Sequence, residues 1–198
     1  MLINGGKEMK RLFARALRLL SVVVMVVTLA PTTANAAAPT TLATLDGKLF
    51  NLAQGWGKAQ SCAVFDRGDV RCFSTHKQLD DLLGYSRSTD SVVLAAQAQS
   101  PAAAAAAIPA CASGWFCIYE AINGGGRRLI FRDEYWQSLA EYAFEDVVSS
   151  YRNNQGSADT AGLCSCNSSL GWHLTISART ISNNIGPSYN DQADRVLG

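Results

Sequence analysis

Residues 144–150 read Phe-Glu-Asp-Val-Val-Ser-Ser, and residues 189–195 read Tyr-Asn-Asp-Gln-Ala-Asp-Arg. The two stretches are offset by 45 residues, and both place an aspartate two residues after an aromatic residue, Asp146 after Phe144 and Asp191 after Tyr189. The same offset relates further glycine and apolar positions: Ile118 to Leu163, Gly126 to Gly171, Leu129 to Leu174 and Phe131 to Ile176. Matches at a constant offset predict one supersecondary unit that is used twice.

The first copy of this unit predicts three β-strands separated by turns. Residues 115–119 are aromatic and β-branched, which favours a strand, and the glycines at 124–126 favour a turn. Residues 127–133 alternate in polarity, which predicts a strand with Leu129 and Phe131 on its buried face. The opposite face, with Arg128, Ile130 and Arg132, is interpreted as solvated. Residues 136–139 suit a short helical turn, and residues 147–152 predict the closing strand.

The pattern of the first copy resembles a known family. Tyr119 followed by Gly126, and then by the acidic pair and Ser149-Ser150, resembles the Greek-key motif of the βγ-crystallin superfamily. The runs 114–120 and 148–154 resemble secreted actinobacterial proteins of peptidase inhibitor family I36, which is named for a metalloproteinase inhibitor with a crystallin-like fold. The resemblance covers residues 111–198. It implies a mainly β fold in which two Greek-key motifs form a βγ-crystallin-like sandwich.

The resemblance also implies a set of candidate Ca²⁺ ligands in the two acidic stretches. These are Glu145, Asp146, Ser149, Asn190, Asp191 and Asp194. Carboxylate and hydroxyl oxygens on a loop are ligands that Ca²⁺ prefers. Glu145 is one methylene longer than the family pattern, and Asp194 stands where the pattern has a hydroxyl. An alternative interpretation stays open, in which these six residues only form turns and caps and bind no ion.

The first 36 residues have the pattern of a secretory signal peptide. Five basic residues precede an apolar run at 19–30, and Ala34-Asn35-Ala36 is a small-x-small cleavage site. We expect a secreted, extracellular chain that is not embedded in a membrane after cleavage. Removal of residues 1–36 leaves 12 of 17 basic and 15 of 16 acidic residues, a formal charge of −3. This balance does not indicate a nucleic-acid partner.

The even number of cysteines predicts disulfide bonds in an exported chain. The six residues are Cys62, Cys72, Cys111, Cys117, Cys164 and Cys166. Residues 62–72 read as a hairpin that turns at Arg67-Gly68, which places Cys62 opposite Cys72. Cys111 and Cys117 can close a small loop or pair with Cys164 or Cys166. A bond between Cys164 and Cys166 is disfavoured because they are so close in sequence, and a metal site is disfavoured because no histidine has ligand-like spacing to them.

The chain divides into four predicted parts. After the signal peptide, residues 37–91 form a disulfide-held α+β extension with the hairpin and a short helix at 77–83 capped by Thr75. Residues 92–110 are rich in alanine and proline and are interpreted as a linker. Residues 111–198 form the crystallin-like domain.

Function is inferred from the resemblance and from the motifs that the sequence lacks. The sequence has no Gly-x-Ser-x-Gly motif, no P-loop and no His-Glu-x-x-His motif, so we expect that the protein is not an enzyme. A glycosidase-type site stays open, because paired carboxylates cannot be recognised from sequence alone. The resemblance implies an inhibitor of an extracellular metalloprotease that acts by insertion of a rigid loop, and we expect a monomer. The reactive loop is unknown, and the segment 156–169 is one candidate. The alternative function is a Ca²⁺-binding or purely structural module, and Trp136 and Trp172 leave a carbohydrate ligand as a third.

Overall fold

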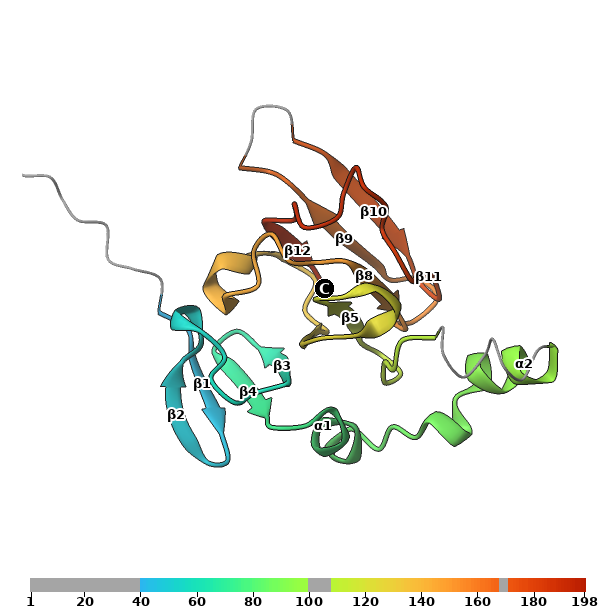
Figure 1. Ribbon diagram of the computed structural model, residues 1–198, viewed down its shortest axis with the longest axis horizontal. Helices are drawn as coiled ribbons and strands as arrows, with labels where there is room; N and C mark the ends of the chain where they lie inside the picture. Colours follow the sequence, from blue (N-terminus) through green and yellow to red (C-terminus); the bar gives the residue numbers. More distant parts are fainter. Residues whose placement is uncertain (1–39, 100–107, 168–170) are drawn as a thin grey trace, which may run out of the picture. The chain divides into compact units, whose positions relative to one another are not determined.

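Two β-sheets form the framework of the described part of the chain, residues 40–99, 108–167 and 171–198 of the computed structural model (Figure 1). The larger sheet has eight strands in the spatial order β11 (Ile181–Ser182), β8 (Ser150–Asn153), β5 (Phe116–Tyr119), β6 (Arg128–Phe131), β3 (Ser61–Asp66), β4 (Asp69–Phe73), β1 (Leu42–Leu45) and β2 (Lys48–Asn51). The smaller sheet has four strands in the order β10 (His173–Ser177), β9 (Thr160–Cys164), β12 (Arg195–Leu197) and β7 (Trp136–Ser138). The predicted mainly β fold class is confirmed.

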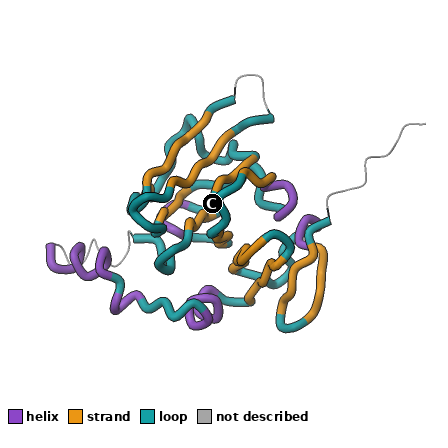
Figure 2. The backbone as a smooth tube through the Cα atoms, turned by 180° about the vertical axis from the view of Figure 1, so that it is seen from behind, coloured by secondary structure: helices purple, strands orange, loops and turns teal. Residues whose placement is uncertain are grey.

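The helices are short, and α1 and α2 lie outside the strands in both views of the backbone (Figures 1 and 2). They are α1 (His76–Leu82), α2 (Ser91–Gln99) and the 3₁₀ turns η1 (Leu52–Gln54), η2 (Arg87–Thr89), η3 (Ile122–Gly124) and η4 (Leu139–Tyr142). Among the described residues, no helix is long and apolar enough to cross a membrane. The predicted signal peptide, residues 1–36, lies outside the described residues.

The 45-residue repeat appears in the strand registers. Tyr119 of β5 pairs with Arg128 of β6, and 45 residues later Cys164 of β9 pairs with His173 of β10. The closing strands correspond as well, since β8 pairs with β5 as β12 pairs with β9. The two copies therefore fold into equivalent units, as the sequence offset predicts.

Each copy gives one strand to the sheet of the other. Strand β7, from the first copy, pairs with β12, and its Trp136 lies opposite Leu197. Strand β11, from the second copy, pairs with β8, and its Ile181 lies opposite Arg152. These two registers are again equivalent at an offset of 45 residues. The exchange joins the two copies through backbone hydrogen bonds.

The main core fills the space between the two sheets. Phe116, Leu129 and Phe131 of the larger sheet and Leu163 and Val196 of the smaller one each have 2% or less of their surface exposed. Truncating one of these aromatic side chains to alanine typically costs about 3–5 kcal/mol of stability.

The predicted α+β extension adds four strands to the larger sheet. Strand β3 pairs in parallel with β6, and Ser61 lies opposite Arg128. The predicted hairpin and capped helix are both present, because Thr75 and Gln78 form a reciprocal capping box at the start of α1. The strands β1 and β2 were not predicted.

The extension covers the face of β6 that the sequence assigns to solvent. Ile130 packs there in a second core with Leu79 of α1 and Trp115. Arg128 is 2% exposed, and its guanidinium lies 2.7 Å from the Asp80 carboxylate. The interpretation of this face as solvated is wrong for Arg128 and Ile130, since alternation within one strand does not reveal what another segment places over it.

The predicted linker, residues 92–110, begins as a helix rather than as irregular chain. Helix α2 follows Asp90, whose carboxylate accepts a hydrogen bond from the backbone N–H of Val92 at 3.0 Å. Residues 100–107 lie outside the described residues. Residues 37–198 cluster as one compact unit, and the domain boundary at the linker stays a prediction.

Candidate functional site

The two acidic stretches lie side by side and bond to each other. The backbone N–H of Asp146 donates to the carbonyl of Ala193 at 2.9 Å, and the N–H of Asp191 donates to the carbonyl of Val148 at 3.1 Å. Asp146 and Asp191 both have left-handed backbones, with φ of 55° and 54°. The tight αL turn at each of these two aspartates therefore brings the two copies together.

Three of the candidate Ca²⁺ ligands meet at the turn of the second copy, around Asp191. Ser149 donates its hydroxyl to the Asp191 carboxylate at 3.2 Å, and the Asn190 amide donates to the same carboxylate at 2.7 Å. A hydroxyl from the first copy thus lies beside an acidic group from the second. These contacts also satisfy the carboxylate without an ion.

The other candidate ligands are arranged differently. The Asp194 carboxylate is 4% exposed and accepts the backbone N–H groups of Cys166 at 2.8 Å and Asn167 at 2.7 Å. Glu145 accepts a hydrogen bond from the Asn167 side chain at 3.4 Å. Among the described residues, Glu145, Asp146 and Asp194 do not bring carboxylate oxygens within 4.8 Å of one another as a set. Ca²⁺ binding stays a prediction.

The loop between β5 and β6, residues 120–127, is exposed at its tip and fixed at its base. Ile122 is 51% exposed. The buried Ser150 hydroxyl donates to the carbonyl of Ala121 at 2.7 Å and accepts from the N–H of Gly124 at 3.0 Å. The N–H of Asn123 donates to the carbonyl of Asn183 in the second copy at 2.8 Å. The Ser150 side chain and the Asn183 carbonyl thus fix the backbone of the loop.

Two glycines permit the loop conformation. Gly124 has φ of 71°, and a Cβ atom there would lie 2.7 Å from Pro109 Cβ. Gly126 has φ of 69°, and a Cβ atom would lie 2.9 Å from Glu120 Cβ. The close approach at Gly126 explains why the sequence motif requires glycine at this position.

An ion pair closes the base of the loop. Arg127 donates through its backbone N–H, at 3.0 Å, and through its Nε, at 2.9 Å, to the Glu120 carboxylate. These hydrogen bonds lower the pKa of Glu120 below its ordinary value. The Arg127 guanidinium also lies 5.1 Å from the centre of the Trp56 ring, where a cation–π contact is favourable.

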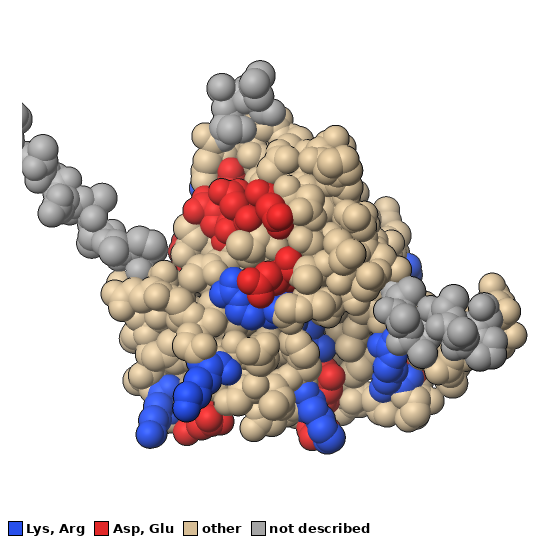
Figure 3. Space-filling view, in the orientation of Figure 1, with Lys and Arg blue, Asp and Glu red and all other residues tan. Residues whose placement is uncertain are grey.

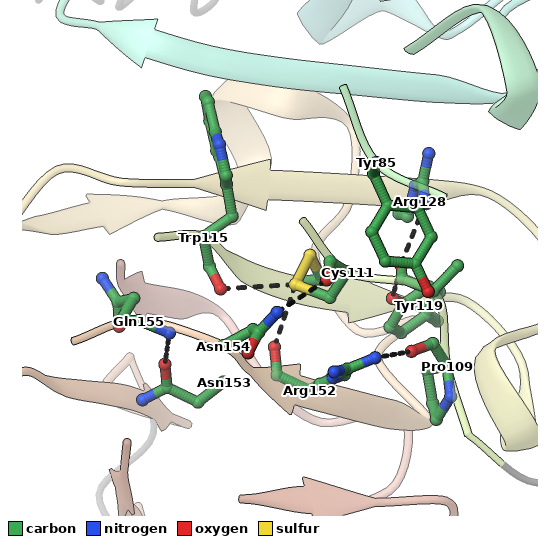
Figure 4. The surroundings of a disulfide bond; sticks show 12 residues. Tyr85, Pro109, Cys111, Trp115, Tyr119, Arg128, Arg152, Asn153, Asn154 and Gln155 are labelled. Atoms are coloured by element: carbon green, nitrogen blue, oxygen red, sulfur yellow. Dashed lines mark hydrogen bonds between the residues drawn. A yellow bond between two sulfur atoms is a disulfide. The ribbon is translucent and has the colours of Figure 1, made fainter. Parts of the chain in front are cut away.

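The segment that supports Gly124 is itself held by a buried arginine. Arg152 donates to the carbonyl of Pro109 at 3.0 Å and to the Asp90 carboxylate at 2.6 Å. Figure 4 shows Arg152 pointing toward Pro109, beside Cys111. Because Asp90 lies in the extension, the extension contributes to the support of the 120–127 loop.

A second buried arginine holds the next residue of this segment. Arg128 donates to the carbonyl of Ala110 at 2.9 Å, and the Tyr119 hydroxyl donates to the same carbonyl. Burial raises the pKa of Tyr119, so this phenol stays a neutral donor.

All six cysteines are paired in the structure, in the pairs Cys62–Cys72, Cys111–Cys117 and Cys164–Cys166. The predicted Cys62–Cys72 bond is confirmed. The expectation that Cys164 and Cys166 would not bond to each other is wrong. Residues i and i+2 of an extended segment point to the same face, and their Cα atoms lie 5.3 Å apart, within the range for a disulfide.

The segment 156–169, the candidate reactive loop from the sequence, is not a continuous loop. Residues 160–164 form β9, which lies between β10 and β12. Its Leu163 and Cys164 are fully buried. Residues 161–164 are therefore unable to enter a protease cleft, and residues 168–169 of the segment lie outside the described residues.

The two histidines have neighbours that their sequence spacing does not show. Ser61 Oγ lies 2.6 Å from His76 Nδ1, an arrangement that resembles a nucleophile and its base. Ser61 is fully buried and also accepts a hydrogen bond from Arg128 at 3.2 Å, so no substrate reaches its hydroxyl. His173 Nε2 lies 3.4 Å from Cys166 Sγ. The sequence spacing, which gave neither histidine a ligand-like distance from the cysteines, therefore misses the proximity of His173 to Cys166.

A cleft of about 630 Å³ lies between the β3–β4 turn and strands β7 and β12. The Arg67 guanidinium lies 4.5 Å from the centre of the Tyr135 ring in its wall, and Arg195 contributes a second positive charge. Glu141 is the one carboxylate among the described lining residues, so the cleft does not hold the carboxylate pair that glycoside hydrolysis uses. Most of the face drawn in Figure 3 is uncharged; one acidic cluster stands alone in the upper part of the view, and below it basic and acidic groups lie beside one another.

Comparison with known proteins gives one family and one group of solved structures. The model of peptidase inhibitor family I36 matches residues 104–166. A βγ-crystallin from Ciona intestinalis is 20% identical, with a TM-score of 0.35, over 42% of this chain and 98% of that chain. A βγ-crystallin domain from Clostridium beijerinckii is 21% identical, with a TM-score of 0.35, over 41% of this chain and 93% of that chain. No curated protein matches the sequence.

The matched residues 104–166 include the whole 120–127 loop, its Ser150 support and both cysteines of the Cys111–Cys117 bond. The resemblance stated from the sequence is therefore confirmed: residues 104–166 match peptidase inhibitor family I36, and the similar solved structures are βγ-crystallin domains.

Proposed function

We propose that this protein is a secreted inhibitor of a metalloprotease and that its 120–127 loop enters the protease cleft. The match of residues 104–166 to a peptidase inhibitor family is the observation that carries the inhibitor role. The choice of loop rests on Ile122, an apolar side chain that is 51% exposed within the matched region. An exposed apolar side chain on a fixed loop suits an apolar substrate pocket of a protease.

The fixation of the loop supports this proposal energetically. A flexible loop loses conformational freedom when it binds, at about 0.5–1.5 kcal/mol for each immobilised side chain. Here Ser150, Pro109 and the Glu120–Arg127 pair fix the backbone before binding. A rigid loop also resists adjustment to the catalytic geometry, so it can occupy the cleft without being cleaved.

The first experiment measures inhibition of a thermolysin-type metalloprotease by the purified, oxidised full chain. The readouts are residual activity on a small substrate and integrity of the added chain on a gel. We expect stoichiometric inhibition with the chain intact. A folded chain that leaves the protease fully active would remove this target class.

A pair of variants tests the loop separately from the inhibitor role. Burial of an isoleucine side chain is worth about 1.5–3 kcal/mol, so Ile122→Asp should raise the inhibition constant about 10- to 100-fold. Leu49→Asp is the matched control, because Leu49 is 71% exposed but lies outside the matched region, on β2. Equal inhibition by Ile122→Asp and the unchanged chain would reject the loop and leave the inhibitor role standing.

A Ca²⁺-stabilised extracellular module is the second candidate function. The contact between the Ser149 hydroxyl and the Asp191 carboxylate favours it, because the contact places oxygens from both copies at one point. An ion that binds only the folded state raises the melting temperature. Unchanged melting of the full chain and of Asp146→Ala and Asp191→Ala variants, with and without Ca²⁺, would exclude this candidate.

A further inference from the structure

Cys164, Cys166 and His173 bring three metal-ligand atoms within 4.8 Å of one another. This is the one such set of histidine, cysteine, aspartate or glutamate groups within residues 40–99, 108–167 and 171–198. The set is built by the sheet, because Cys164 of β9 pairs with His173 of β10. The Cys166 Sγ to His173 Nε2 distance of 3.4 Å shows that the imidazole faces the sulfur.

We propose that reduction of the Cys164–Cys166 disulfide converts this cluster into a binding site for a thiophilic divalent ion such as Zn²⁺. Two thiolates and one imidazole are ligands that Zn²⁺ prefers, and water completes its usual four-coordinate shell. A dithiol reductant supplies two electrons and two protons, the S–S bond breaks, and the reductant becomes a disulfide. Binding of the ion then releases the two thiol protons and forms two metal–sulfur bonds.

The site keeps its shape without the disulfide, because other bonds fix its backbone. The Asp194 carboxylate accepts the N–H groups of Cys166 at 2.8 Å and Asn167 at 2.7 Å. The N–H of Ser165 donates to the carbonyl of Trp172 at 3.0 Å. Cys164 is also held from its second side, where it pairs with Arg195 of β12. The two sulfurs therefore stay near His173 when the S–S bond opens.

This disulfide is also the easiest of the three to open. Its cysteines are 2 residues apart, against 6 and 10 for the other two pairs, so its loop contributes least to the stability of the oxidised chain. Both cysteines of the Cys62–Cys72 and Cys111–Cys117 bonds are 2% exposed or less. Cys166, in contrast, lies beyond the end of β9, beside the exposed His173. Accessible disulfides react first with thiolates.

The order of reduction is tested on the oxidised full chain. The chain is treated with increasing amounts of a dithiol, free thiols are alkylated, and the labelled peptides are identified by mass spectrometry. We expect labels on Cys164 and Cys166 while the other four cysteines remain bonded. Opening of Cys62–Cys72 or Cys111–Cys117 first, or of all three bonds together, would overturn the proposal.

Metal binding is then measured by adding Zn²⁺, or Co²⁺ as a coloured probe, to the selectively reduced chain. We expect one ion per chain, a thiolate-to-cobalt absorption band and no binding to the oxidised chain. The variant His173→Ala should bind the metal ion at least 100-fold more weakly than the unchanged chain. Loss of a residue that only contacts a ligand typically lowers metal affinity 10- to 100-fold, so a larger loss indicates a direct ligand. Thr175→Ala, which lies on the same face of β10, is the matched control and should bind unchanged.

Two results would contradict the site. Equal affinity of His173→Ala and Thr175→Ala would show that the imidazole is not a ligand. Failure of the reduced chain to bind either ion would reject the site altogether. A Cys164→Ser, Cys166→Ser double variant keeps the Asp194 contacts and should stay folded without binding, which separates loss of ligands from loss of fold.

Discussion

Asp146 and Asp191 occupy equivalent positions in the two copies of the repeat, and each donates its backbone N–H to the copy in which the other lies. Both residues adopt the left-handed conformation, which aspartate tolerates better than most residues because its short side chain bonds locally. The two turns therefore hold the copies together at the point where the acidic stretches meet.

Replacement of Asp191 tests the cost of this left-handed turn. Asp191→Val should destabilise the chain by about 1–2 kcal/mol, because a β-branched side chain is disfavoured at positive φ. Asp191→Gly should lose much less, since glycine adopts this conformation freely. Chemical denaturation measures both. The neighbouring exposed residue Gln192, changed to valine, should have little effect; a similar loss there would show that the turn is not the cause.

Removal of Asp90 tests the buried ion pair with Arg152. The two side chains are 4% and 2% exposed, so Asp90→Ala leaves the buried charge of Arg152 without a counter-ion. We expect a loss of about 3–5 kcal/mol in the free energy of unfolding. Removal of the exposed partner Asp81 from Lys77, by Asp81→Ala, is the control and should cost less than about 1 kcal/mol. Equal effects of the two changes would show that Arg152 finds other partners.

The pH dependence of stability tests the environment of His76. Burial, with the charge of Arg128, lowers the pKa of His76 below its ordinary value of 6.5. The unfolded chain therefore takes up a proton at a higher pH than the folded chain does. Stability should be full above about pH 6.5 and should fall as the pH drops from there toward the lower folded pKa.

The groups that face His76 come from β3, from β6, from the 120–127 loop and from its own helix, α1. They are Ser61, Arg128, the carbonyl of Gly126 and Asp80. Denaturation at several pH values should show a weaker dependence between pH 5 and 7 in His76→Gln than in the unchanged chain. An identical dependence in both would assign the effect to another group.

Ser150→Ala tests the fixation of the 120–127 loop. The change removes the acceptor of the Gly124 N–H and the donor to the Ala121 carbonyl, at a cost of about 1–3 kcal/mol. We expect reduced thermal stability and, where the chain inhibits its protease, a raised inhibition constant. Ser182→Ala, which removes one exposed hydrogen bond on β11, is the control. An unchanged inhibition constant in Ser150→Ala would show that the loop does not need this support to bind.

Local patterns in the sequence predicted the repeat, the β3–β4 hairpin, the Cys62–Cys72 bond and the cap of α1. Each depends on residues close together along the chain or on a constant offset. The short β1–β2 hairpin was missed, although Asp46-Gly47 is good turn chemistry between two apolar runs. The sequence therefore contained enough information to predict the β1–β2 hairpin.

Contacts between distant segments were beyond the reach of these patterns. The burial of Arg128 depends on Asp80, and that of Arg152 depends on Asp90, 62 residues away. The proximity of His173 to Cys166 depends on the register of β9 and β10. The 45-residue offset relates Cys164 to Tyr119 and His173 to Arg128, so the pairing of β9 with β10 follows from the pairing of β5 with β6.

The parallel pairing of β3 with β6 has a consequence for the order of folding. Ser61 and Arg128 are 67 residues apart, so this pairing must close a long loop, whereas the β3–β4 hairpin and its disulfide form locally. The β3–β4 hairpin can therefore form early in folding and pair with β6 late, when it extends the larger sheet. A chain shortened to residues 111–198 would leave β6 with unpaired backbone groups, and bare edges of this kind promote aggregation.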